Sequence, residues 1–270
     1  MRFLVVPLLV LVFVVRTGVA RADVYGRAVK LQNEIVRTIL KQPKGAWAEY
    51  VVKYQGNTMR QKAVNLGKIN SFTVEEFQYP GGAAQVWLKL IKRRVIYRHR
   101  LHTVLVLKPV KMYLLQKGKV LVMNEDEIEA DREINGSAAM KELIVPEGSR
   151  ELRIKDYFYK VPATKDVLKA VDVEFINKDS DKVEIVLSKR VPLCLLKRRE
   201  GMVYSYLYNY GFHGGKAVIS RSMRKRAVPF SEVFGKALEN SGEEKSGGDG
   251  VIQLPKGFKL PDNLKDLLGN

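Results

Sequence analysis

Apolar and polar positions alternate over most of the chain after residue 46. Short segments rich in Val, Ile, Leu and aromatic residues recur between turn-forming residues, a pattern typical of antiparallel β-strands. This pattern predicts roughly a dozen strands. The predicted strands are 47–54, 59–66, 71–79, 85–91, 95–107, 110–115, 120–123, 151–161, 171–176, 183–187, 191–196 and 202–210.

Several neighbouring strands read as hairpins. The clearest hairpin surrounds residues 116–119, Gln-Lys-Gly-Lys; others turn at 177–181 and at 197–201. Because hairpin follows hairpin, and a sheet this wide tends to curl or close, we predict a mainly β fold of the α+β type. The expected architecture is a large curved antiparallel sheet, or unclosed β-barrel, with an N-terminal helix and short lid helices.

The N-terminal helix is predicted from apolar residues that recur at spacings of three and four between Val24 and Leu40. Asp23 is placed to cap its start, and Pro43 to end it. Short helices are predicted at 138–143, at 164–170 and from Ser231 onward. Helices laid over the concave face of a curved sheet would leave an apolar cavity.

The first 22 residues resemble a targeting segment. A positive start at Arg2 precedes an apolar run from Phe3 to Val15, which is shorter than the ~20 residues of a membrane span. Small residues at Ala20 and Ala22 form a cleavage site. We therefore predict a periplasmic protein cut after Ala22.

Four segments follow from this organisation. They are a signal peptide at 1–22, a β domain at 23–239, a flexible Gly- and Ser-rich loop at 240–250, and a strand with a helical turn at 251–270 that packs on the same domain.

The chain is strongly basic, with a formal charge of +18 that falls to +15 when Arg2, Arg16 and Arg21 leave with the signal peptide. The basic residues gather between Glu76 and Glu125, where no acidic residue occurs. They are Lys89, Lys92, Arg93, Arg94, Arg98, Arg100, Lys108, Lys111, Lys117 and Lys119. Such a charge favours anionic partners, and export argues against nucleic acid as the partner.

Tyrosine recurs at every second position near the end of the predicted sheet, at Tyr204, Tyr206, Tyr208 and Tyr210. In a regular strand all four share one face. Two interpretations stay open: an aromatic ladder in a core or at a sheet edge, or an aromatic lining for an apolar ligand. On the second interpretation the candidate ligand-binding residues are Trp87, Leu88, Tyr204, Tyr206 and Tyr208.

The candidate contacts to anionic headgroups or to an acidic partner are Arg93, Arg94, Arg98 and Arg100. A solvated basic sheet face is the alternative for these four charges.

No motif indicates catalysis, a metal or a cofactor. The histidines His99, His102 and His213 and the lone Cys194 form no zinc-binding pattern. Glu75 and Glu76 are adjacent, so on a strand they diverge and do not form an acid–base pair. A buried inert thiol is expected for Cys194. We predict a protein that is not an enzyme.

Four short segments resemble the outer-membrane lipoprotein-sorting family of Lol-type periplasmic carriers. Residues 93–98, Arg-Arg-Val-Ile-Tyr-Arg, are similar to its basic-aromatic strand, and 117–122 to its Gly-Lys hairpin. Residues 203–210 are similar to its late strand, and 254–258, Leu-Pro-Lys-Gly-Phe, to its closing segment. The resemblance implies an unclosed barrel whose apolar cavity holds acyl chains beneath a lid.

The first hypothesis for function is therefore a periplasmic, non-enzymatic carrier or binding protein for a lipid or lipoprotein acyl chain. Its partners would be the lipid or lipoprotein and a membrane surface or acidic membrane-associated protein, not nucleic acid. The alternative is a regulatory or structural periplasmic module that binds acidic protein or cell-wall polymer through charge alone, with strong salt dependence.

Overall fold

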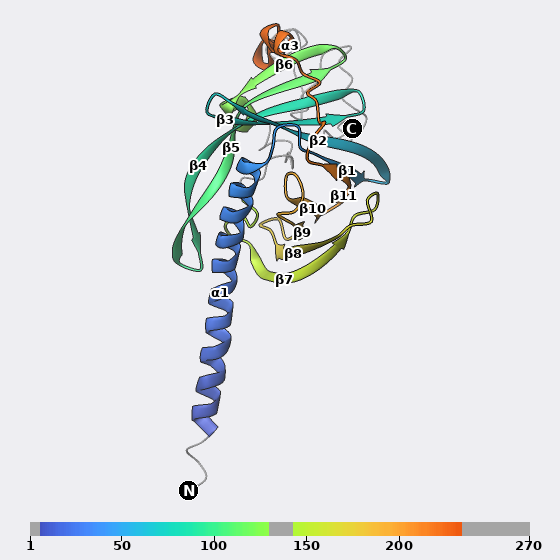
Figure 1. The fold of residues 1–270 in the computed structure, drawn as a ribbon. Helices are drawn as coiled ribbons and strands as arrows, with labels where there is room; N and C mark the ends of the chain where they lie inside the picture. The colour runs from blue at the N-terminus through green and yellow to red at the C-terminus, as the bar shows by residue number, and fades with distance from the viewer. Residues whose placement is uncertain (1–5, 130–142, 234–270) are drawn as a thin grey trace, which may run out of the picture.

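The predicted strands assemble into a single sheet. The computed structural model describes residues 6–129 and 143–233, with side chains placed from residue 24 onward. Its 12-stranded sheet has the order β12-β6-β5-β4-β3-β2-β1-β11-β10-β9-β8-β7 (Figure 1). All neighbouring strands are antiparallel except β12, which runs parallel to β6. The sheet is not closed into a barrel, so the predicted mainly β class is confirmed.

The strand bounds are as follows. They are β1 Trp47–Tyr54, β2 Asn57–Ile69, β3 Phe72–Tyr79, β4 Gly82–Tyr97, β5 Arg100–Gln116, β6 Lys119–Asn124, β7 Arg150–Lys160, β8 Val167–Ile176, β9 Lys182–Leu187, β10 Leu195–Glu200, β11 Val203–Gly211 and β12 Val228–Pro229. The helices are α1 Val6–Lys41 and the short α3 Arg221–Lys225, and residues 125–129 and 230–233 are also helical.

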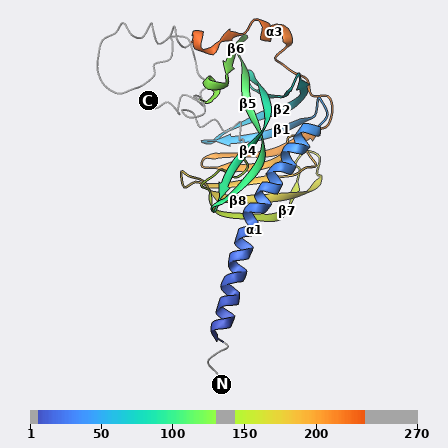
Figure 2. The ribbon, with the colours of Figure 1, turned by 90° about the vertical axis from the view of Figure 1, so that its left-hand side faces the viewer.

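Helix α1 packs with its C-terminal half against the sheet, while its first turns extend away from it (Figures 1 and 2). The predicted apolar stripe is buried: Tyr25, Ala28 and Ile35 join a cluster with residues of β4, β5, β8 and β9. Polar side chains fix the helix as well, because Gln32 donates to the backbone oxygen of Leu105 at 2.9 Å. The helix is continuous from Val6, so Asp23 lies inside it and is not its N-cap.

Strands β4 and β5 extend beyond the residues with which their neighbours β3 and β6 pair. β3 pairs with β4 only as far as Leu88, and β6 pairs with β5 only from Lys111 onward. Residues 89–108 therefore form a two-stranded ribbon beside α1 (Figure 2). Such ribbons twist more strongly than wide sheets, which explains why Leu88 faces one apolar cluster while Val95, of opposite parity, packs on α1.

The segment after β11 crosses back over the sheet and ends as β12 beside β6. Buried Glu76 of β3 anchors it: one carboxylate oxygen accepts from the backbone N–H of Val218 and from Gln78 Nε2, and the other accepts from Ile219 N–H and Gln85 Nε2, at 2.5–3.0 Å. Charge-assisted hydrogen bonds of this kind are the strong ones in proteins. Ile219 is then buried among residues of β4, β5 and β6.

Some local predictions are confirmed and others are wrong. The hairpin at Lys117–Gly118 is confirmed, because Gln116 pairs with Lys119. The helix predicted at 164–170 is wrong, because β8 begins at Val167, where pairing with β7 overrides local propensity. The hairpin predicted to turn at 197–201 turns later, since β10 runs to Glu200.

Only some of the remaining predictions for helices and for the C-terminal segments fall on described residues. A helix is present at 230–233, as expected from Ser231. The predicted helix at 138–143, apart from its last residue, and the segments 240–250 and 251–270 lie outside the described residues.

Replacing Glu76 should loosen the segment that it anchors. In Glu76→Gln the new amide group faces two donors that formerly bonded to an oxygen, so we expect a loss of roughly 2–4 kcal/mol of unfolding free energy. Urea denaturation measures this loss, and amide hydrogen exchange should show faster exchange at Val218 and Ile219. The matched control is Asp179→Asn on an exposed loop; equal effects of the two variants would contradict the anchoring role.

Candidate functional site

The ribbon of residues 89–108 presents an exposed surface that is both apolar and basic. We call it the ribbon surface; its residues are Leu90, Lys92, Arg94, Ile96, Leu101 and Thr103. Ile96 pairs with Leu101 across the two strands, and these side chains are 59% and 62% exposed. Exposed aliphatic pairs flanked by cations are unusual on a solvated surface and indicate contact with another molecule.

The tip of the ribbon is a tight turn that adds further charge. Arg98 and His99 both adopt left-handed backbone conformations, with φ of 48° and 65°, as a two-residue hairpin turn of the primed type requires. Sequence reasoning had placed both residues inside a strand, because neither is a typical turn former.

The structure divides the four predicted arginine contacts. Arg93 forms an ion pair with Glu147 at 3.7 Å, and Arg98 lies 5.5 Å above the ring of Tyr25 of α1. Arg94 and Arg100 are exposed, and neither has a partner among the residues that the structure describes. These two are therefore available to an anionic partner.

Trp87 and Leu88 are both predicted to line one ligand site, but adjacent strand residues point to opposite faces of a sheet. Trp87 contacts the rings of Phe72 and Tyr113, with centroids 5.9 and 6.2 Å apart. Leu88 is buried in a different cluster with Val86 and Met112. The structure brings neither of them to the tyrosines of β11.

The predicted tyrosine stripe is broken by a β-bulge. Tyr50 pairs with Leu207 and Glu49 with Asn209, so the ladder skips Tyr208 and the alternation reverses. Tyr210 consequently packs against the cluster that contains its partner Ala48. The prediction that all four tyrosines share one face is therefore wrong for Tyr210.

Tyr204 and Tyr206 remain on a common face, with ring centroids 5.6 Å apart. Tyr208 carries the guanidinium of Arg60 above its ring at 4.2 Å. The tyrosine face also bears charge, since Lys197 lies 5.8 Å above the ring of Tyr204. This lining is amphipathic, not purely apolar.

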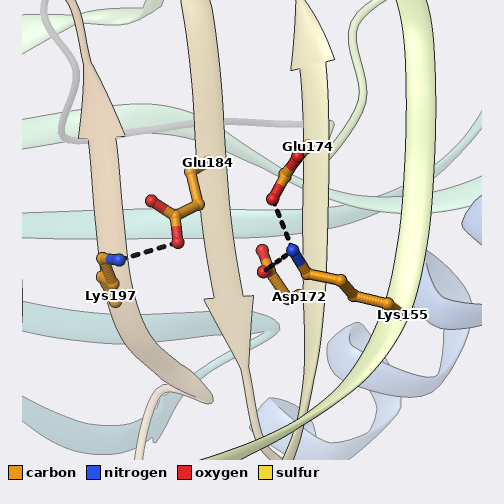
Figure 3. Close-up of polar contacts among 5 residues, drawn as sticks. All are labelled: Lys155, Asp172, Glu174, Glu184 and Lys197. Carbon is orange, nitrogen blue, oxygen red and sulfur yellow. Dashed lines mark hydrogen bonds and ion pairs between the residues drawn. The ribbon is translucent and has the colours of Figure 1, made fainter.

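An ion-pair ladder crosses β7–β10 beside these tyrosines (Figure 3). Lys155 of β7 reaches Asp172 at 3.1 Å and Glu174 at 2.6 Å, both on β8, while Lys197 of β10 binds Glu184 of β9 at 2.7 Å. The hydrogen bond from Lys155 lowers the pKa of Glu174. Burial raises the pKa of Asp172 in spite of the same lysine. Opposite charges across strands stabilise pairing and register, so the ladder has a sufficient structural role.

The residue that sequence reasoning missed is Glu75, next to the anchor Glu76. Its side chain is only 8% exposed, on the opposite face of β3. Within the described ranges no hydrogen bond or ion pair reaches it. Burial raises the pKa of Glu75 to about 7. The available signal was a pair of adjacent acidic residues inside a predicted strand.

The described residues hold neither a cluster of metal ligands nor a thiol of lowered pKa. Across residues 24–129 and 143–233, no three His, Cys, Asp or Glu side chains converge as metal ligands. Burial raises the pKa of Cys194 to about 12, as expected for an inert thiol. No helix in the described ranges is both long and apolar enough to cross a membrane.

No family model matches the chain, and no curated protein matches it.

The buried carboxyl of Glu75 should make stability fall as pH rises. Its pKa is about 7 in the folded protein against 4.5 for the free side chain, so its favourable contribution is present below pH 4.5 and is lost as pH rises through 7. Compared with Glu75→Gln, the wild type should lose roughly 2–3 kcal/mol of unfolding free energy between pH 5 and pH 8. Denaturant midpoints at both pH values measure this difference; parallel profiles for the two proteins would contradict it.

Proposed function

We propose that this protein is a non-enzymatic carrier or binding protein for a lipid or lipoprotein acyl chain, acting at an anionic membrane surface in the periplasm. The observation that carries the proposal is the ribbon surface, where exposed aliphatic side chains lie among the exposed cations Lys92 and Arg94. The predicted signal peptide and the resemblance to the Lol-type carriers support the compartment and the cargo class.

The composition of the ribbon surface suits the boundary between headgroups and acyl chains. A cationic side chain near an anionic bilayer contributes about 1 kcal/mol of binding free energy. Complete burial of an Ile or Leu side chain contributes about 1.5–3 kcal/mol. Ile96 and Leu101 together with Lys92 and Arg94 therefore provide useful, reversible affinity for such a surface.

The sheet supports a carrier in a second way. Its apolar residues fall into several separate clusters instead of one central core, and α1 contributes to only one of them. An open sheet with divided clusters can admit an acyl chain between them, whereas a single continuous core would have to be disrupted. Each buried methylene of the ligand contributes about 0.8 kcal/mol.

The alternative function is an interaction module for an acidic protein or cell-wall polymer. The net charge is compatible with both functions. The exposed Ile96–Leu101 pair favours a lipid surface, because a soluble polyanion needs only the charges.

Vesicle sedimentation tests the proposal. Reversing the two cations of the ribbon surface, Lys92 and Arg94, to Glu should lower the fraction bound to phosphatidylglycerol-containing vesicles at least tenfold at low salt. The matched control reverses two exposed lysines elsewhere, Lys160 and Lys169, and should bind as the wild type does. Equal binding by the ribbon variant and the control would remove the role of the ribbon surface.

A second variant separates lipid from polymer. Replacing Ile96 and Leu101 with Asn should weaken binding to vesicles while leaving binding to poly-glutamate unchanged, because only a bilayer offers apolar contact. If this variant binds vesicles as well as the wild type does, the charge-only module becomes the better account.

A further inference from the structure

Two adjacent glutamates on β3 have opposite environments. Glu76 accepts four hydrogen bonds and holds the chain segment that crosses the sheet. Glu75 faces the other way and accepts none within the described part of the chain, although its side chain is more than nine-tenths buried. A buried polar group without a partner costs about 1–3 kcal/mol, so this arrangement requires an explanation.

Apolar side chains flank Glu75 toward β4 and toward the end of β3. Its cross-strand partner on β4, Val86, belongs to one apolar cluster. Phe77, two residues along β3 on the same face, packs against that cluster and also against the one containing Tyr50 and Leu207. Glu75 therefore lies where two apolar clusters meet.

The polar groups near Glu75 are already committed to other partners. Tyr50 of β1 donates its hydroxyl hydrogen to the backbone oxygen of Leu195 at 3.2 Å. Asn65 of β2, which pairs with Glu75, donates to the backbone oxygen of Gln42 at 3.3 Å. Gln42 in turn donates to the backbone oxygen of Val191 at 3.1 Å. These side chains thus donate to backbone oxygens, and none of them forms a hydrogen bond with the Glu75 carboxyl.

The titratable groups that interact with Glu75 are Tyr50 from β1 and Cys194 from the segment before β10. Burial raises the pKa of both, so each is neutral near pH 7. No cation contributes to the environment of Glu75. A carboxyl group without a nearby cation is most stable in its neutral form, which can donate one hydrogen bond.

We propose that the Glu75 carboxyl is the polar contact of the acyl-chain site, where it donates a hydrogen bond to the ester or amide carbonyl at the head of the chain. The inference rests on the proposed function and deepens it. The apolar clusters on either side of Glu75 receive the chain, and the carboxyl recognises the one polar group that such a ligand brings with it. Loss of the proton removes the donor and places an anion beside the carbonyl oxygen.

Proton linkage follows from this arrangement. Because the ligand stabilises the protonated form, binding raises the proton affinity of Glu75, and above pH 7 the protein takes up a proton as it binds. A carrier built in this way holds its cargo more tightly in mildly acidic surroundings and releases it more easily as pH rises.

Titration calorimetry with 1-monolauroylglycerol, a neutral acyl ester, tests the inference in the intact mature protein. The wild type should bind about tenfold more weakly at pH 8.5 than at pH 6. In buffers of different ionisation enthalpy it should take up about half a proton on binding at pH 8. Glu75→Gln keeps a neutral donor, so it should bind tightly at both pH values without proton uptake. Glu75→Leu keeps the size but not the donor, so it should bind weakly at both.

The outcomes separate this inference from the proposed function. If all three proteins bind equally and without a pH dependence, Glu75 is not a ligand contact, while the carrier function stands. A pH effect on unfolding without one on affinity means that Glu75 has only a structural role, which also overturns the inference. If no protein binds the ester at either pH, both the inference and the acyl-chain function fail.

Discussion

The backbone ladder between β1 and β11 is the contact on which the rest of the structure depends. It joins β1–β6 to β7–β11, and without it the chain would form two separate sheets. The ladder connects residues about 160 positions apart, so its formation carries a large chain-ordering cost. Gly211 completes it, because a Cβ there would lie 2.7 Å from the indole nitrogen of Trp47, which donates to the backbone oxygen of His213 at 3.0 Å.

The β1–β11 ladder also determines where the ribbon surface and the β3 glutamates lie. It places α1 between the β4–β5 ribbon and the strands β7–β9, and packing on α1 forces the twisted ribbon to expose its other side. It also curls β7 back toward β11, where Tyr159 donates to the backbone oxygen of Leu207 at 2.6 Å. At the centre of the sheet, β3 turns one glutamate toward backbone donors and its neighbour toward apolar clusters.

Local sequence patterns predicted what depends on local contacts. The alternation in 47–54 and the Lys117–Gly118 turn were sufficient to place β1 and the β5–β6 hairpin. The bulge at Tyr208 and the turn at Arg98 could not be predicted, because pairing with a distant strand sets the first and ribbon twist sets the second. Of the candidate site residues, Arg94 and Arg100 are exposed as expected. Glu75 is notable because it is buried without a partner, and this burial depends on tertiary packing alone.

Native mass spectrometry of the protein, purified from its host and extracted with solvent, tests the central claim most directly. The account predicts a co-purifying lipid or acylated peptide, bound one to one and retained better at pH 6 than at pH 8.5. A protein that emerges empty at both pH values, and that binds acidic polymer in a salt-sensitive manner, would contradict the carrier function and favour the charge-only module.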